Sequence, residues 1–328
     1  MSQSLAPSLR QVAVTDIALD DHTFQVTYRP DMTALQRSVA QVGVLTPVHL
    51  RQRAEHAPLQ VVCGRKRLLA CQHTGCPSVP ALVHQVEALS DLQAWLLVLH
   101  DNLGCRQLNV VEKGRLLLHL RPYAPTQPAT WLHDVCRLLE LPPRDETLET
   151  YCRLAVVPEP LQTAVVEEGL PVETALWIST HAAVDGSALQ ELFTRLKVGT
   201  NRARELATYL DEICQRDACR PAELLQALGL SPLLEDARLT GPQKLDNVRR
   251  LIRQARYPQL STYEQRFQEA LRHLRLPPQI SLRPPPYFEG QQYQVTLNFR
   301  QPQELQHYAQ RLLDAAGHEA LERLLELL

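Results

Sequence analysis

The sequence predicts an α+β protein with three domains, and three observations support this fold class. Residues 1–100 alternate short apolar runs with helical patterns, which indicates a mixed N-terminal domain. Residues 101–215 keep a helical pattern throughout, which indicates an all-α middle domain. Residues 216–328 combine basic helical segments with a proline-rich stretch and one alternating run, which indicates a small basic α+β domain of unknown role. A chain of 328 residues is long enough for two or three domains.

The N-terminal domain is expected to hold four strands and three helices. Gly43 ends one apolar helical pattern as a typical C-cap, and Ser90 begins another as a typical N-cap. The expected strands cover residues 12–19, 46–51, 59–64 and 80–86, and the expected helices cover residues 32–43, 65–75 and 90–103.

The middle domain contains two helical patterns with the shape of a helix-turn-helix. These patterns cover Thr130–Leu139 and Glu146–Val156, follow a first helix at Val110–Leu120, and are separated by a proline-containing turn. The alternative is an ordinary pair of packed helices. The second helix of the pair carries three acids beside Arg144 and Arg153, and those two arginines are the candidate DNA contacts.

The C-terminal domain carries the main cluster of positive charge. A helix expected over residues 243–258 places Arg249, Arg253 and Arg256 on one face, because they recur at three- to four-residue spacing. This face either contacts DNA phosphates or pairs with acids of another domain. The other expected elements are a helix over 261–273, a strand over 293–300 and a closing helix over 304–328, continuous or broken near Gly317.

The composition is that of an ordinary soluble protein. The net charge is −2, so only local clusters indicate a nucleic-acid partner. We expect no secretion signal and no membrane span, because no apolar run reaches about 18 residues. Lysine is rare beside arginine, which indicates either phosphate-binding guanidinium groups or a compositional bias of the genome. The eight cysteines form no C-x-x-C pair, so we expect reduced thiols and no zinc site.

A glycine and three cations, Gly64 to Arg67, stand where an expected strand meets an expected helix. A glycine lets the backbone approach a phosphate, and the helix N-terminus offers free N–H groups. Arg65, Lys66 and Arg67 lie where cations oppose the helix dipole, which favours an anion nearby. The alternative is a tight turn with a solvated basic first helical turn. A second cluster, Asp101, Asn102 and Arg106, offers oxygen ligands for Mg²⁺ and a guanidinium group for phosphate, or else forms a capped loop.

The order of these motifs resembles the ParB family of partition proteins. Residues 35–39 and 42–48 resemble its "L-x-x-S-I … G-h-h-Q-P-h" stretch, and residues 63–70 resemble its "G-x-R-R-x-x-A" phosphate motif. Residues 101–112 resemble "E-N-x-x-R-x-x-L-x-x-h-E". Residues 153–158 and 167–176 resemble the helical domain that follows the family's helix-turn-helix. The resemblance covers roughly residues 12–212 and implies a ParB/sulfiredoxin-like N-terminal domain.

The resemblance implies a protein that binds DNA and also binds CTP, or another nucleoside triphosphate, together with Mg²⁺. It places Gly64 and the three cations on the triphosphate, Asn102 on the metal, and Asp101 where the family has a glutamate tied to hydrolysis. It places Ser38, Gly43 and Pro47 near the base. It also implies a homodimer, a partition ATPase as a partner, a cytoplasmic location on nucleoid or plasmid, and no membrane partner.

Several residues depart from the family pattern. Thr46 replaces a glutamine, Lys66 an arginine, and Asp101 a glutamate, while Cys105 takes the place of the arginine that Arg106 supplies one residue later. The family's Q-P-R box is not visible, and residues 24–31 substitute for it poorly. These changes affect hydrolysis more than binding. The expected function is therefore a ParB-like nucleotide-responsive DNA-binding protein with slow or lost CTP hydrolysis. The alternatives are a phosphotransfer enzyme like a free-serine kinase and a scaffold that has lost the nucleotide.

Overall fold

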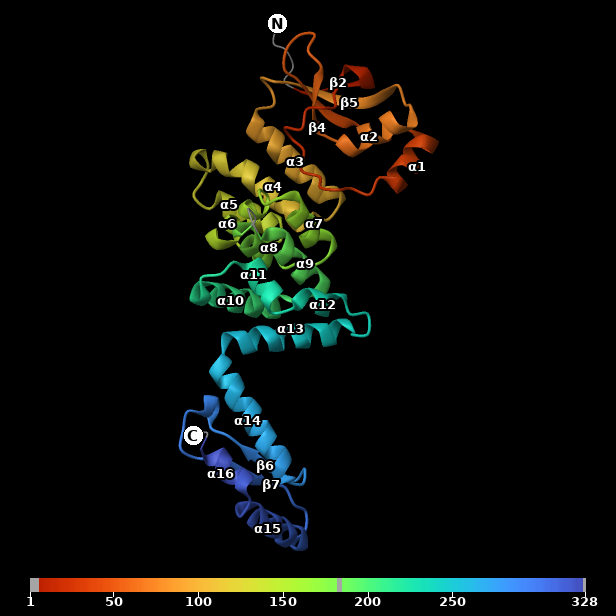
Figure 1. The fold of residues 1–328 in the computed structure, drawn as a ribbon. Helices are drawn as coiled ribbons and strands as arrows, with labels where there is room; N and C mark the ends of the chain where they lie inside the picture. The colour runs from red at the N-terminus through yellow and green to blue at the C-terminus, as the bar shows by residue number, and fades with distance from the viewer. Residues whose placement is uncertain (1–5, 182–184, 327–328) are drawn as a thin grey trace. The chain divides into compact units, whose positions relative to one another are not determined.

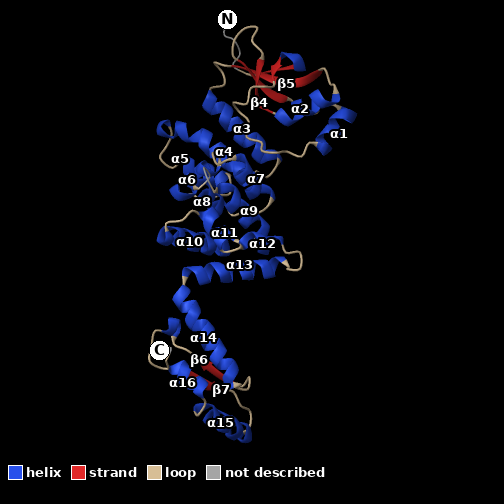
Figure 2. Ribbon diagram, in the orientation of Figure 1, coloured by secondary structure: helices blue, strands red, loops and turns tan. Residues whose placement is uncertain are grey.

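The computed structural model describes residues 6–181 and 185–326, and the chain divides into two compact units, Met1–Thr200 and Asn201–Leu328. Figure 1 gives the course of the chain, and Figure 2 shows the strands in two groups, one in each unit. Each group of strands is accompanied by helices, so the predicted α+β class is confirmed.

A mixed five-stranded sheet forms the N-terminal part of the first unit. Its strands are β1 (Ser8–Ala13), β2 (Ile17–Ala18), β3 (Val48–Gln52), β4 (Leu59–Cys63) and β5 (Ser78–Gln85), in the order β1-β5-β3-β4-β2. Strand β3 runs parallel to β5 and antiparallel to β4. Strand β4 is buried along its whole length, as its largely apolar sequence requires.

The single strand expected over residues 12–19 is wrong. Strand β1 pairs with β5 at one edge of the sheet, whereas β2 pairs with β4 at the opposite edge. One continuous strand cannot serve both edges, so a 3₁₀ turn at Val14–Asp16 carries the chain between them.

Three helices accompany the sheet: α1 (Thr33–Val42), α2 (Arg65–Thr74) and α3 (Asp91–Cys105). Gly43 ends α1 at a φ of 71°, as its sequence position predicts. Ser90 begins α3 with a capping box, in which its hydroxyl accepts from Gln93 N–H and the Gln93 side chain accepts from Ser90 N–H. A core that includes Val48, Leu50 and Leu68 lies between sheet and helices.

A 3₁₀ helix at Arg121–Thr126 and six α-helices complete the described part of the first unit: α4 (Val110–Leu120), α5 (Trp131–Leu138), α6 (Asp145–Leu154), α7 (Glu159–Glu167), α8 (Val172–Thr180) and α9 (Gly186–Leu196). Helices α4 and α6 approach closely at Gly114. A Cβ atom there would overlap the carbonyl oxygen of Tyr151 and lie 3.2 Å from its carbonyl carbon. Glycine is therefore required by packing at this helix crossing.

The second unit begins with helices α10 (Thr200–Asp217), α11 (Pro221–Ala227), α12 (Leu230–Glu235), α13 (Gly241–Arg256) and α14 (Pro258–Leu274). Strands β6 (Ile280–Arg283) and β7 (Gln294–Leu297) then form an antiparallel pair. The chain closes with α15 (Pro302–Ala316) and α16 (Glu319–Leu325), so the closing helix is broken near Gly317. A small core that includes Phe267, Leu274 and Leu324 holds this end together.

Both expected domain boundaries fall inside helices. Residue 100 lies within α3, and residue 215 lies within α10. Continuous helices cross these positions because each carries an uninterrupted apolar face. The division into a nucleotide-binding, a helix-turn-helix and a C-terminal part remains a prediction about roles.

Candidate functional site

A cavity of about 420 Å³ lies in the first unit, at the turn that connects β4 to α2 and beside the end of α3. It brings together seven of the sequence-predicted residues, although they come from two segments about 35 residues apart. These residues are Gly64, Arg65, Lys66, Arg67, Asp101, Asn102 and Arg106.

Gly64 shapes the floor of this cavity. Its φ is 94°, a left-handed conformation, and a Cβ atom would lie 2.7 Å from Val48 Cγ1. The first intrahelical bond of α2 comes from Arg67 N–H to the Gly64 carbonyl. The N–H groups of Arg65 and Lys66 therefore precede the helical hydrogen-bond ladder and are available to an anion.

The three cations of the turn have different partners. Arg65 donates to the backbone carbonyls of Leu19 and Asp21. Arg67 donates to the carbonyls of Thr46 and Pro47, both at 2.7 Å. These two guanidinium groups therefore brace the loops around the cavity.

Lys66 differs from both neighbours. Among the residues that the structure describes, its ammonium group has no hydrogen-bond or ion-pair partner. Burial, together with the nearby Arg106 guanidinium, lowers the pKa of Lys66. An anion in the cavity would reverse that effect, so Lys66 is the cation best placed to meet a ligand.

Asn102 and Arg106 belong to one hydrogen-bonded network. Arg106 Nε donates to Asn102 Oδ1 at 2.9 Å, and Arg106 Nη1 pairs with Glu112 Oε2 at 2.7 Å. The Glu112 side chain is almost completely buried and also accepts from the N–H groups of Tyr28 and Asn109. The network fixes Arg106 at the cavity wall even though it stands one position later than the family pattern.

Two side chains that line the cavity near this network offer oxygen atoms as metal ligands. Asp101 Oδ2 lies 3.9 Å from Arg67 Nη2, and Asn102 Oδ1 keeps a lone pair beyond its bond from Arg106. The described residues contain no group of three or more His, Cys, Asp or Glu side chains that could hold a metal ion. Mg²⁺ would therefore need oxygens of its ligand in addition to Asn102.

The sequence motifs did not predict one wall of the cavity. It consists of residues 24–27, in the stretch that substitutes for the family's Q-P-R box. Phe24 packs edge-on against Trp95 at 5.1 Å, and the Arg51 guanidinium lies 5.0 Å from the Phe24 ring centre. The following Tyr28 hydroxyl contacts Thr163 of α7 at 2.8 Å. Only the position of this stretch before the other motifs could have indicated its role.

The three residues predicted to lie near the base differ from one another in their relation to the cavity. Ser38 is exposed on α1, and neither Ser38 nor Gly43 lines the cavity. Pro47 contributes through its carbonyl, which holds Arg67. Leu35 is the α1 residue that reaches the cavity wall.

The proposed recognition helix is α6, and both Arg153 on this helix and Arg144 directly before it are exposed. Neither Arg144 nor Arg153 has an ion-pair partner among the described residues. Two of the three acids are paired: Asp145 lies 2.9 Å from His133, and Glu149 lies 3.0 Å from Arg121. Pairing reduces the repulsion that these acids would exert on a DNA backbone. The DNA contact itself stays a prediction.

The arginines of α13 are engaged within the second unit. Arg249 pairs with Glu205 at 2.8 Å, and Arg256 pairs with Glu212, both on α10. Arg253 makes two bonds of 2.8 Å to Glu264 of α14. The geometry thus favours the ion-pair alternative for this face, because Coulomb attraction to carboxylates already occupies each guanidinium.

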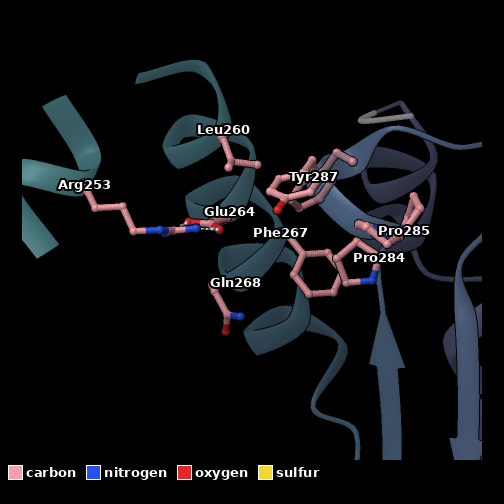
Figure 3. Close-up of a pocket in the computed structure, with 10 residues that line it drawn as sticks. Arg253, Leu260, Glu264, Phe267, Gln268, Pro284, Pro285 and Tyr287 are labelled. Carbon is pink, nitrogen blue, oxygen red and sulfur yellow. Dashed lines mark hydrogen bonds and ion pairs between the residues drawn. The ribbon is translucent and has the colours of Figure 1, made fainter. Parts of the chain in front are cut away.

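Figure 3 shows Arg253 and Glu264 meeting at one side of a second cavity of about 630 Å³. The opposite side is formed by Pro284, Pro285 and Tyr287. The Tyr287 side chain is largely exposed. The sequence indicates no function for this segment. Tyr287 lies outside the small core, whereas Phe288 packs against it.

Comparisons with known proteins bear on the first unit. Residues 4–102 match the family model of the ParB N-terminal domain. The chromosome-partitioning protein ParB of Caulobacter vibrioides strain NA1000 / CB15N is 31% identical over 85 residues, which cover 26% of this chain and 27% of the relative. The chain thus matches about a quarter of the length of that relative. The same identity and coverage are found for ParB of strain ATCC 19089.

Solved structures resemble the chain weakly. C-terminally truncated ParB from Caulobacter crescentus, complexed with CTP-gamma-S, gives a TM-score of 0.27 at 24% identity and covers 56% of this chain and 98% of that one. The pNOB8-like ParB N-domain gives a TM-score of 0.37 at 15% identity and covers 63% and 89%.

The family match identifies residues 4–102 as a ParB N-terminal domain. The resemblance to the ParB family that the motifs predict is thus confirmed by this domain and by the curated ParB relative. In the described part of the chain, no helix has the length and apolar character needed to cross a bilayer.

Proposed function

We propose that this protein is a nucleotide-responsive DNA-binding protein of the partition type, and that it binds CTP with Mg²⁺ in the 420 Å³ cavity. The observation that carries the proposal is the convergence of the Gly64–Arg67 turn with Asp101, Asn102 and Arg106 around one space. A ParB N-terminal domain match and a curated ParB relative support the same class.

The residues have distinct roles in this proposal. The free N–H groups at the start of α2 and the Lys66 ammonium group bind phosphate oxygens. Asn102 supplies one oxygen to the metal, which neutralises charge on the phosphates. Arg67 holds the loop at Thr46 and Pro47, where the base would lie.

Hydrolysis is expected to be slow or absent. The Asp101 carboxylate is one methylene shorter than the family's glutamate, and it lies near Arg67 rather than in a network of its own. A general base must lie within hydrogen-bond reach of the water it activates. The shorter side chain therefore weakens catalysis more than binding.

DNA contact is assigned to the first unit. Arg144 is exposed directly before α6 and Arg153 is exposed on it, and α6 is the second helix of the predicted helix-turn-helix. Such a helix would enter the major groove, and its flanking cations would bind phosphates. A homodimer that clamps DNA, and a partition ATPase as its partner, complete the proposed role.

Calorimetric titration of the purified full chain with CTP, ATP and GTP, with and without Mg²⁺, tests the proposal. Selective, Mg²⁺-dependent CTP binding is the expected result. A preference for ATP, followed by transfer of its γ-phosphate to a small hydroxyl compound, would instead establish a phosphotransfer enzyme. Absence of binding by all three nucleotides would leave a scaffold and refute the proposal.

A further inference from the structure

All eight cysteines are thiols in the structure, and two pairs share one arrangement. Cys71 and Cys76 flank the end of α2, and Cys214 and Cys219 flank the end of α10. Each pair is separated by four residues, although the two helices belong to different units and have unrelated sequences.

Both helices end in the same backbone geometry. The residue before the second cysteine is left-handed in each case: Gly75 has a φ of 73°, and Ala218 has a φ of 51°. The N–H of the second cysteine then donates to the carbonyl of the first, at 3.0 Å in α2 and 3.2 Å in α10. These features define a Schellman motif, in which the side chains at these two positions characteristically contact each other.

The sulfur atoms at the end of α2 make that contact. The Cys76 thiol contributes to the raised pKa of Cys71, and its sulfur also lies 3.4 Å from the Thr74 hydroxyl oxygen. The backbone hydrogen bond from the second cysteine to the first holds the two residues close together, as a disulfide requires. A bond of this kind is otherwise prevented by poor Cα and Cβ placement.

The two thiols of this pair differ in access to solvent. Cys71 is fully buried, and burial, with a smaller effect of Cys76, raises its pKa to about 11. Cys76 is partly exposed. A dissolved oxidant therefore reacts with Cys76 first, while the buried Cys71 remains a protonated thiol. Cys214 and Cys219 are both partly exposed.

We propose that each pair is a redox modification site, at which a peroxide converts a dithiol into a disulfide across the end of the helix. Cys76 releases its proton, its thiolate attacks a peroxide oxygen and the O–O bond breaks. The departing hydroxide takes up that proton, so the products are a sulfenic acid and water. The sulfur of Cys71 then attacks the Cys76 sulfur, the S–O bond breaks, and a second water leaves. Two thiols lose two electrons, and one hydrogen peroxide becomes two waters. Cys214 and Cys219 follow the same steps.

This site is independent of the proposed nucleotide function, because neither pair lines the cavity. The reaction is reversible by thiol–disulfide exchange, so a reducing compartment returns both pairs to thiols. The bridge closes only a six-residue loop, and its formation leaves the two units as they are.

The test is oxidation of the native full chain with hydrogen peroxide, followed by alkylation of remaining thiols, tryptic digestion without reduction and mass spectrometry. Cleavage separates Cys214 in residues 205–216 from Cys219 in residues 217–238, since Pro221 protects the bond after Arg220. Their disulfide thus appears as two linked peptides. The Cys71–Cys76 bridge appears as loss of two hydrogens within residues 68–106, and dithiothreitol restores both signals.

Two controls make the result specific. Cys136 and Cys152 are both buried, and they should stay reduced at the same dose of peroxide. The peptide 68–106 also contains Cys105, so a Cys105→Ser variant should form the bridge unchanged, whereas Cys76→Ser should lose it. Loss of the bridge in Cys105→Ser would assign it to that exposed thiol and overturn the α2 site. Intact thiols at either helix end, under a dose that oxidises Cys105, would overturn the site at that end.

Discussion

At the scale of single residues, three consecutive cations turn out to have separate tasks. The carbonyl partners of Arg65 and Arg67 make these side chains part of the loop structure. Lys66 is the cation left to face the cavity. The sequence pattern alone treats the three as one cluster, and only their partners distinguish support from ligand contact.

We predict that Lys66→Met weakens CTP binding about 10- to 100-fold and leaves the melting temperature nearly unchanged. One charge-assisted hydrogen bond contributes about 1.5–3 kcal/mol, and methionine keeps the length of the side chain without its charge. Calorimetric titration of CTP with Mg²⁺ measures the affinity, and a thermal melt measures stability.

Lys113→Met is the matched control, because Lys113 lies on α4 and does not line the cavity. Its affinity for CTP should equal that of the unmodified protein. Equal affinities for both variants would remove Lys66 from the phosphate site.

At the scale of elements, the crossing of α4 and α6 depends on one glycine. We predict that Gly114→Ala destabilises the first unit by about 1–3 kcal/mol, since the added methyl overlaps the Tyr151 backbone and the helices must separate. Gly104→Ala is the control within another helix, because no atom lies within 4 Å of a Cβ there. Chemical denaturation should give a lower midpoint for Gly114→Ala, and an equal or higher one for Gly104→Ala.

Strands β3 and β5 carry a histidine pair with a pH signature. His49 Nδ1 lies 3.1 Å from His84 Nε2. Burial lowers the pKa of both histidines; nearby Arg67 lowers that of His49 further, and Asp101 opposes this effect. The folded state thus binds protons less readily than the unfolded state, whose histidines titrate near about 6.5. Stability is complete above that pH and falls as the pH drops from there toward the folded-state values.

We therefore predict that the melting temperature falls between pH 7 and pH 5, and that the double variant His49→Gln, His84→Gln reduces this fall. His100→Gln, on the exposed end of α3, should keep the full dependence. Thermal melts across this pH range test both statements. A dependence identical in all three proteins would show that other groups cause it.

Much of this architecture follows from local sequence signals. Ser90, Gly43 and the apolar spacing of α4 specify elements whose bounds depend on nearby residues, and these predictions succeeded. The prediction of one strand over residues 12–19 failed because the partners of β1 and β2, which are β5 and β4, are distant in sequence. The cavity wall at Phe24 was missed for the same reason, since its contacts with Trp95 and Arg51 are set by tertiary packing.

At the scale of the whole molecule, charge is distributed in a way that the totals conceal. The α13 arginines are paired with glutamates of α10 and α14, so they stabilise the second unit locally. Arg144 and Arg153 in the first unit have no such partners among the described residues. A count of cations favours α13 as the DNA surface, whereas the pairing of each guanidinium favours Arg144 and Arg153, and both surfaces stay predictions.

We predict that the double variant Arg144→Ala, Arg153→Ala weakens binding to a DNA duplex, whereas Arg249→Ala leaves it unchanged and lowers the melting temperature. Each lost phosphate contact reduces the slope of log affinity against log salt by about 0.9, so the double variant should reduce it by about 1.8. Fluorescence anisotropy at several salt concentrations, with CTP and Mg²⁺ present and absent, measures both quantities. If Arg249→Ala instead lowers the slope while the double variant keeps it, the DNA surface belongs to the second unit, and the glutamate pairs of α13 must open when DNA binds.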